Sequence, residues 1–324
     1  MLAYIVRRLL LGIPTVLGVL FILFVLFFWI AKPEHMALQA LGNKAGREQI
    51  DQWIEDHGYH LPKFFNAAER GVQQFSQAQL FQHYRAMLTF DFGRADLDDI
   101  LITEKIRNGI APSLALAVPT FVFSLFFSIS FSLLIALFRG TYIDNLGVVL
   151  SVLGMSIVIF IYIIGGQFLF GKVLRWFPIS GWLADYMFHF LTLPIMVGIL
   201  AGMGASVRFY RTIMVNEINS DYVRTARAKG LGDIAILFKH LLKNAMIPIL
   251  TQVVMAIPFL FTGSLLMESF FGIPGLGRLT VEAIQNNDFS TVSAMVYIGS
   301  LLYILGNLVT DMSYTFVDAR VRLR

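Results

Sequence analysis

Residues 112–138 read PSLALAVPTFVFSLFFSISFSLLIALF and contain no Asp, Glu, Lys or Arg. An α-helix rises about 1.5 Å per residue and the hydrocarbon core of a bilayer is about 30 Å thick, so roughly 20 apolar residues can cross it. This run is therefore long enough to span a membrane as one helix. Pro112 suits the first helical turn, where a missing N–H costs nothing, whereas Pro119 should kink the helix.

Five other charge-free runs of comparable length occur along the chain. They cover residues 9–31, 145–171, 186–207, 244–267 and 289–310. A buried helix of a soluble protein could account for one such run, but six would require an implausibly large soluble core. The sequence therefore predicts an all-α integral membrane protein with six transmembrane helices.

The composition agrees with this prediction. Only 14% of the 324 residues are charged, and the mean hydropathy is +0.70. A net charge of +4 is too small to indicate nucleic-acid binding, and the absence of Cys excludes disulfides, thiolate catalysis and Cys-ligated metals. The run 9–31 is longer than a signal-peptide core and no small-x-small cleavage site follows it, so we interpret residues 1–31 as a tail and a retained first span.

The distribution of Lys and Arg predicts the orientation of the chain. Thirteen of them lie before the first predicted span, after the second, between the fourth and fifth, and at the C-terminus, whereas the short loops of the other side hold three. The positive-inside rule then places both termini and the loop 208–247 in the cytoplasm. Residues 32–111 become an extracytoplasmic segment, residues 112–313 a core of five spans and residues 314–324 a cytoplasmic tail.

The extracytoplasmic segment shows patterns of short amphipathic helices. One helical face has an i, i+3, i+4, i+7 spacing and consists of Ile50, Trp53, Ile54 and His57. Gly58 is a stop signal for this helix. Ser76 and Gln79 form a capping-box pattern ahead of a second helix. We expect such helices to pack on the membrane face rather than to form an independent domain.

Residues 221–244 read DYVRTARAKGLGDIAILFKHLLKN and place a dense group of charges between the fourth and fifth predicted spans. Lys229 suits the last turn of a helix, Gly230 the position just after it, and Asp233 the N-cap of a second helix. The second helix would carry an apolar stripe of Ile234, Leu237, Phe238, Leu241, Leu242 and Ala245. Contact with anionic headgroups explains the charge. It does not explain the small residues of the corner, which are Ala226, Ala228, Gly230 and Gly232.

This stretch resembles the cytoplasmic signature loop of ABC importer permeases, with 224–226 in the place of a Glu-Ala-Ala-like triplet and Gly230 in that of its glycine. More narrowly, DYVRTARAKGL (221–231) and HLLKNAMIP (240–248) resemble the B-type permease of dipeptide and oligopeptide importers. Further similar motifs are YIVRRLLLGIPT (4–15), FDFG (90–93), FPISG (177–181), ESFFGIPGLGR (268–278) and DMSYTFVDAR (311–320). TGSLLME (262–268) and DMSYTFVD look closest to the subgroup that imports larger peptides and microcin C. The chain departs from the family pattern at residues 32–35 and at Ala319.

The resemblance implies a type I ABC importer fold and a multi-pass permease subunit of the bacterial inner membrane. Such a subunit imports di- or oligopeptides or peptide-like compounds and forms half of the translocation pathway. Its implied partners are a second, C-type permease, two ABC ATPases and an extracytoplasmic peptide-binding protein. The chain would bind no cofactor and catalyse no reaction, because the ATPase subunits use the ATP and Mg²⁺.

The resemblance also implies which residues contact the ATPase. The coupling loop would consist of Arg224, Thr225, Ala226, Arg227, Ala228, Lys229, Gly230, Leu231 and Asp233. In this interpretation the three basic side chains supply polar contacts, and the small residues allow a close fit. After the fifth span, an outer gate or a contact with the binding protein is implied for Glu268, Pro274, Gly275 and Gly277.

Polar residues within the spans are further candidates. Gln167, Thr251, Gln252 and Asn307 could line a translocation pathway, although helix–helix hydrogen bonds are the more frequent use of such groups. The segment 166–173, GQFLFGKV, nearly matches a phosphate loop, but it lacks the Ser or Thr that would hold Mg²⁺ and follows no strand. The His residues show no metal-ligand pattern, so no metal site is expected.

A nickel or oligosaccharide importer is an alternative of the same class. A proton-coupled transporter or a membrane-embedded enzyme would need ionisable or nucleophilic groups inside the membrane, and the six predicted spans hold no Asp, Glu, Lys or Arg. A stand-alone channel would not need a loop with a glycine corner.

Overall fold

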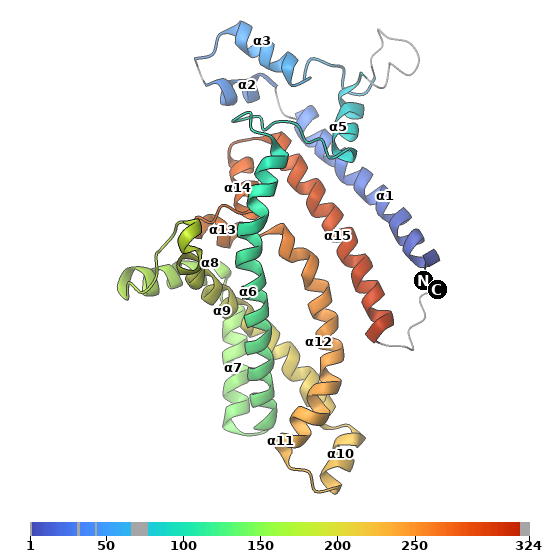
Figure 1. The fold of residues 1–324 in the computed structure, drawn as a ribbon, viewed down its shortest axis with the longest axis vertical. Coiled ribbons are helices and arrows are strands. Elements are labelled where there is room, and N and C mark those ends of the chain that lie inside the picture. Colours follow the sequence, from blue (N-terminus) through green and yellow to red (C-terminus); the bar gives the residue numbers. More distant parts are fainter. Residues whose placement is uncertain (1, 31–32, 43, 66–76, 318–324) are drawn as a thin grey trace. The chain divides into compact units, whose positions relative to one another are not determined.

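A computed structural model describes residues 2–30, 33–42, 44–65 and 77–317. Within these ranges the chain is almost entirely helical (Figure 1), and the single extended pairing is an isolated bridge between Arg94 and Leu101. The all-α prediction is confirmed. Ser76 of the predicted capping box and the predicted tail from residue 318 onwards lie outside the described residues.

Five described helices are long and apolar enough to cross a membrane. They are Val6–Phe27, Ile102–Leu137, Ala184–Ile218, Asp233–Thr262 and Phe289–Met312. A sixth span exists if Tyr142–Ser156 and Ile159–Val173 are counted as one, although the two segments meet at 93°. The third predicted span is thus a broken helix rather than a straight one. Ile157 and Val158 adopt extended backbone angles at the break, a conformation that suits β-branched residues.

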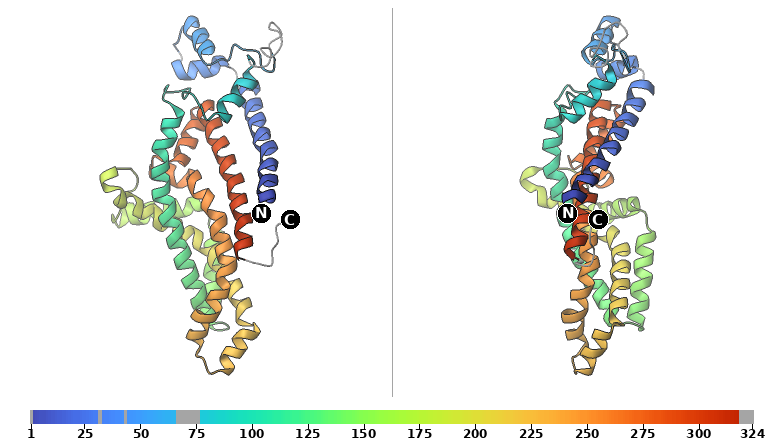
Figure 2. Two further views of the ribbon diagram at one scale, coloured as in Figure 1. Left: turned by 45° about the vertical axis from the view of Figure 1, so that its right-hand side comes forward. Right: turned by 90° about the vertical axis from the view of Figure 1, so that its right-hand side faces the viewer.

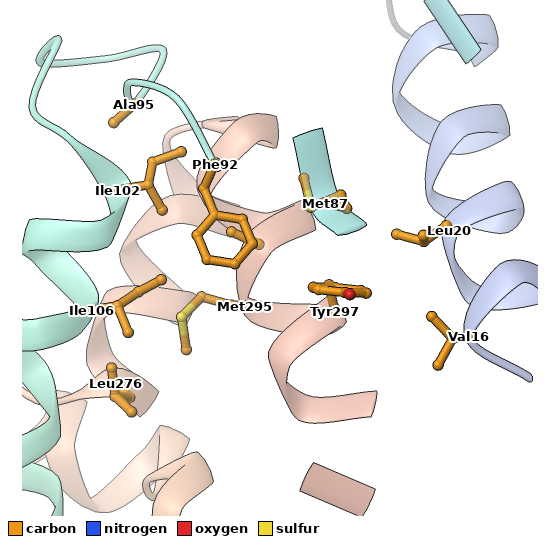
Figure 3. Close-up of a cluster of buried hydrophobic side chains, with 11 residues drawn as sticks. Val16, Leu20, Met87, Phe92, Ala95, Ile102, Ile106, Leu276, Met295 and Tyr297 are labelled. Carbon is orange, nitrogen blue, oxygen red and sulfur yellow. The ribbon is translucent and has the colours of Figure 1, made fainter. Parts of the chain in front are cut away.

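The chain divides into two compact units, each with its own core. Among the described residues, the first unit comprises 2–30, 33–42, 44–65, 77–111 and 275–308. Its helices are α1 (Leu2–Phe24) with a π-helical extension (Val25–Ile30), α2 (Pro33–Leu41), α3 (Arg47–Asp56), α5 (Gln79–Leu88), the start of α6 (Ile102–Leu137), α14 (Leu276–Gln285) and most of α15 (Phe289–Val317). Figure 3 shows its core, in which Leu20 of α1, Met87 of α5 and Tyr297 of α15 approach one another.

The helices of residues 32–111 correspond to the amphipathic pattern. Trp53 of α3 is buried against Met36 and Ala37 of α2. The helix ends at Asp56, and Gly58 follows with a φ of 71°, a left-handed value that glycine adopts readily. The role predicted for Gln79 is wrong, because its side chain does not cap α5. Its Nε2 donates 2.8 Å to the carbonyl oxygen of Tyr59 instead.

Among the described residues, the second unit comprises 112–274 and 309–317. After the body of α6 come α7 (Tyr142–Ser156), α8 (Ile159–Gly166) with a π-helical end (Gln167–Val173), a 3₁₀ turn (Ala184–Tyr186), α9 (Met187–Ile218), α10 (Asp221–Ala228), α11 (Asp233–Ile236), a π-helical turn (Leu237–Leu241), α12 (Leu242–Ala256), a 3₁₀ turn (Ile257–Thr262) and α13 (Leu265–Phe271). Two glycines bring its helices into close contact. A Cβ added to Gly204 of α9 would lie 2.6 Å from the backbone nitrogen of Met155 in α7. One added to Gly147 of α7 would lie 2.5 Å from Ile135 of α6.

The fifth predicted span also differs from the prediction. Residues 244–267 are not one helix, because the 3₁₀ turn ends at Thr262 and Gly263 adopts a φ of 74° before α13 begins. A residue with a Cβ would be strained in this conformation, so the glycine permits the break. Non-helical backbone within an apolar span is tolerated where protein buries it.

Candidate functional site

The loop between α9 and α12 forms the predicted helix–corner–helix. Figures 1 and 2 show α10 and α11 together at the lower end of α12. Lys229 follows the last residue of α10, and Gly230 has a φ of 77°. The N–H of Gly230 donates 2.9 Å to the carbonyl oxygen of Arg227, which closes the helix. A glycine at this position therefore reverses the chain without strain.

Asp233 is not the N-cap that the sequence predicted. Gly232 occupies the N-cap position, and Asp233 is the first helical residue of α11. Its carboxylate lies 3.6 Å from Nε of Arg227, and both side chains are more than half exposed. A negative charge in the first turn still suits the helix dipole. The ion pair itself is solvated and contributes little to stability.

The inner side of the corner is a small apolar cluster. Val223 and Ala226 of α10 pack against Ile236 of α11, and all three are buried. The small side chain of Ala226 therefore serves contact within the loop, not the approach of a partner as predicted. Beside this cluster, the hydroxyl of Tyr222 donates 2.7 Å to Oε2 of Glu217. Burial raises the pKa of the Tyr222 hydroxyl above its usual value.

The predicted apolar stripe of the second helix is divided between two surfaces. Leu237, Leu241 and Ala245 are buried in a cluster with residues of α6 and α9. Ile234 and Phe238 are instead 67% and 62% exposed. The π-helical turn Leu237–Leu241 accounts for the difference, because it changes the 3.6-residue phase on which the prediction relied.

The outer surface of the corner combines apolar and basic side chains. Ile234, Phe238 and Leu231 are exposed, and so are Lys229 and Arg224, whose side chain is 75% accessible. Thr225 and Ala228 are exposed as well, and the Thr225 hydroxyl donates 3.0 Å to the carbonyl oxygen of Asp221. Exposed large apolar groups with a charged rim are typical of protein–protein contact surfaces.

Glu268 lies inside the second unit, not on its surface. It belongs to α13 and has 0% exposure. Its Oε1 accepts hydrogen bonds from Oγ of Ser113 at 2.8 Å and from the backbone N–H of Ser264 at 2.9 Å. The carboxylate thus connects the start of α13 to α6. The predicted contact with a binding protein is not available to this buried side chain, and the sequence did not indicate Ser113 as its partner.

A cavity of about 330 Å³ lies beside Glu268 within the same unit. Thr120 and Ser124 of α6 contribute hydroxyls to a lining that is otherwise mainly apolar. Gly198 allows α9 to approach α6 closely, since a Cβ added to this glycine would lie 2.7 Å from the methyl group of Thr120. Of the other motif residues, Pro274 is exposed, whereas Gly275 and Gly277 are buried at the start of α14.

The polar residues predicted within the spans do not form one group. Nε2 of Gln167 donates 3.0 Å to the carbonyl oxygens of both Ile179 and Phe270, and Thr251 donates to its own helix. Gln252 is exposed. Asn307, in the first unit, lines a cavity with Arg8. Gln167 therefore serves hydrogen bonding within the unit, which is a more frequent use of polar groups inside membrane spans than lining a pathway.

The phosphate-loop resemblance at residues 166–173 coincides with the end of α8 and its π-helical continuation. It is not the strand–loop–helix that such a loop requires. Across the described parts of the chain, no three His, Asp or Glu side chains converge as metal ligands would.

Comparison with known proteins now assigns the chain to a family. Residues 112–323 match the family model described as "Binding-protein-dependent transport system inner membrane component". The chain is 30% identical to the glutathione transport system permease protein GsiC of Salmonella paratyphi A, and the match covers the full length of both chains. It is 31% identical to the oligopeptide transport system permease protein AppB of Bacillus subtilis, over 99% of both chains. A probable peptide ABC transporter permease of Sinorhizobium fredii is 31% identical over 78% of this chain and 83% of its own. The chain therefore belongs to the family of binding-protein-dependent transport system inner membrane components, as a multi-pass protein of the inner membrane.

Proposed function

We propose that this chain is the permease subunit of an ATP-driven importer of peptides or peptide-like compounds. Family membership supports the transport role. The substrate class rests on the relatives, whose names specify glutathione, peptide and oligopeptide transport. No relative named here supports the alternative of a nickel or oligosaccharide importer.

The importer would contain four kinds of subunit. This chain pairs with a second, C-type permease, so that each supplies half of the translocation pathway. Two cytoplasmic ATPases bind and hydrolyse ATP with Mg²⁺, and an extracytoplasmic binding protein delivers the peptide. This chain then has no catalytic role of its own and binds neither the nucleotide nor the metal.

The exposed surface of the α10–α11 corner is the observation that carries the proposal. Ile234 and Phe238 are large apolar groups that the described parts of the chain leave mostly uncovered, so they are free to contact an apolar surface of a partner. Arg224 and Lys229 surround them with positive charge suited to acidic groups on an ATPase. Gly230 leaves the turn without a side chain, so a partner surface can approach the backbone.

Co-purification followed by transport tests the proposal. The chain, tagged, is expressed together with the permease and ATPase genes that flank its own gene. We expect the ATPases to co-purify, and vesicles with the complete complex and its binding protein to take up a labelled oligopeptide only with ATP. ATP-dependent uptake of labelled Ni²⁺ or of an oligosaccharide in place of the peptide would contradict the substrate class. Absence of any ATPase from the purified wild-type complex would contradict the transport mechanism.

A further inference from the structure

We infer that Asp144 and Arg211 are positioning residues that make α7 and α9 move with the α10 corner as one body. The inference rests on the proposed function, in which an ATPase pushes on that corner. Nε of Arg211 donates 2.8 Å to Oδ1 of Asp144, and Nη2 of Arg211 lies 2.7 Å from the same oxygen. The pair joins the first turn of α7 to the last two turns of α9.

The environment of the pair distinguishes it from a surface ion pair. The Asp144 side chain is 7% exposed and that of Arg211 is 24% exposed. The second oxygen of Asp144, Oδ2, accepts the N–H of Gly140 at 3.0 Å, so both oxygens of the carboxylate are held. A pair that is largely removed from water is screened little by salt, and loss of one partner leaves an uncompensated buried charge.

A second link runs parallel to the first. Nη1 of Arg139, at the corner between α6 and α7, donates 3.0 Å to Oδ1 of Asn219. Asn219 directly follows α9, and the next residue, Ser220, is the N-cap of α10. The α6–α7 corner thus holds α9 near its end and at the point where the chain enters α10.

Close helix contacts make the three long helices suitable for transmitting a displacement. Gly204 brings α9 against the backbone of α7, and Gly147 brings α7 against α6. At Gly204 the backbone of α9 meets backbone atoms of α7, which leaves little room for these two helices to slide, whereas the neighbour of Gly147 is the side chain of Ile135. A displacement of α10 would therefore reach α7 through Arg211 and Asp144 without being absorbed at the end of α9.

A purely structural role makes a different prediction from a positioning role. If the pair only stabilises the fold, its loss lowers thermal stability and leaves uptake per ATP hydrolysed unchanged in the protein that remains folded. If it positions the corner, its loss separates hydrolysis from uptake.

The first arm of the test measures uptake per ATP in vesicles containing the complete importer. We expect Asp144→Asn and Arg211→Gln each to lower this ratio at least tenfold while ATPase activity persists. Removal of an exposed pair serves as the control: Arg94→Gln breaks a contact of 3.2 Å to Asp99, whose side chain is 78% exposed, and should leave the ratio unchanged. An unchanged ratio in Asp144→Asn would overturn the inference.

The second arm needs no ATPase and therefore separates this inference from the proposed function. The chain has no Cys, so spin labels can be attached at the exposed positions Leu150 and Asp221 through L150C and D221C alone. We expect a narrow distribution of label distances between α7 and α10 in the wild-type background. Asp144→Asn should broaden the distribution. An equally narrow distribution in Asp144→Asn would refute the inference, even in a chain that co-purifies with no ATPase.

Discussion

Replacement of Gly230 by Leu should abolish uptake while the protein still folds and inserts. Gly230 has a φ of 77°, and an added Cβ would meet no atom within 4 Å. The cost within the chain is therefore conformational only, about 1–2 kcal/mol for a side chain in the left-handed region. Typical domains are stable by about 5–15 kcal/mol, so the fold should survive this loss.

The effect on docking should be larger than the effect on folding. Gly230 lies at the centre of the exposed corner, and a Leu side chain there would project into the space that a partner surface must occupy. Each 1.4 kcal/mol of lost docking free energy lowers the affinity about tenfold. We therefore expect ATPase subunits to co-purify at least about tenfold less with Gly230→Leu, and peptide uptake in vesicles to fall with them.

Gly42 provides a matched control. It has a φ of 91°, and an added Cβ would likewise meet no atom within 4 Å. Gly42→Leu therefore introduces a similar backbone strain in the segment between α2 and α3, far along the chain from the corner. Both variants should appear in the membrane fraction at comparable levels, but only Gly230→Leu should lose uptake. Wild-type uptake in Gly230→Leu, or an equal loss in Gly42→Leu, would refute the reasoning.

Two further predictions concern buried groups. Glu268→Leu leaves Oγ of Ser113 and the N–H of Ser264 without this acceptor, and each lost partner costs about 1–3 kcal/mol. Thermal unfolding in detergent should therefore occur at a clearly lower temperature in Glu268→Leu than in Glu268→Gln, which keeps an acceptor. Equal unfolding midpoints in the two variants would contradict this prediction. Burial lowers the pKa of His83 from 6.5 to about 4. Between pH 6.5 and pH 4 the unfolded chain therefore binds more protons than the folded chain. The free energy of unfolding should fall by roughly 3 kcal/mol as the pH drops through this range. Denaturant titrations at pH 7 and pH 4.5 measure this fall in the free energy of unfolding, which should be smaller in His83→Leu. An equal fall in the wild-type protein and in His83→Leu would argue against the prediction.

The sequence by itself determined the class of fold and the local form of the loop. Charge-free runs long enough to cross a bilayer identify membrane helices regardless of their neighbours, because the lipid removes every alternative partner for the backbone. The corner at Gly230 followed from local preferences as well, since helices commonly end at a glycine that follows a basic last turn. The orientation of the termini rests on the charge distribution alone and stays a prediction.

The tertiary structure decided which polar groups work together and which surfaces remain free. Ser113 and Glu268 are 155 residues apart, and Asp144 and Arg211 are 67 apart. No periodicity in the sequence relates such positions, because their contact depends on how whole helices pack. The exposure of Ile234 and Phe238 depends on one π-helical turn, and the break at residues 157–158 carries neither Gly nor Pro. Hydrophobic length determines that a segment enters the membrane, whereas helix packing determines which of its side chains remain available for function.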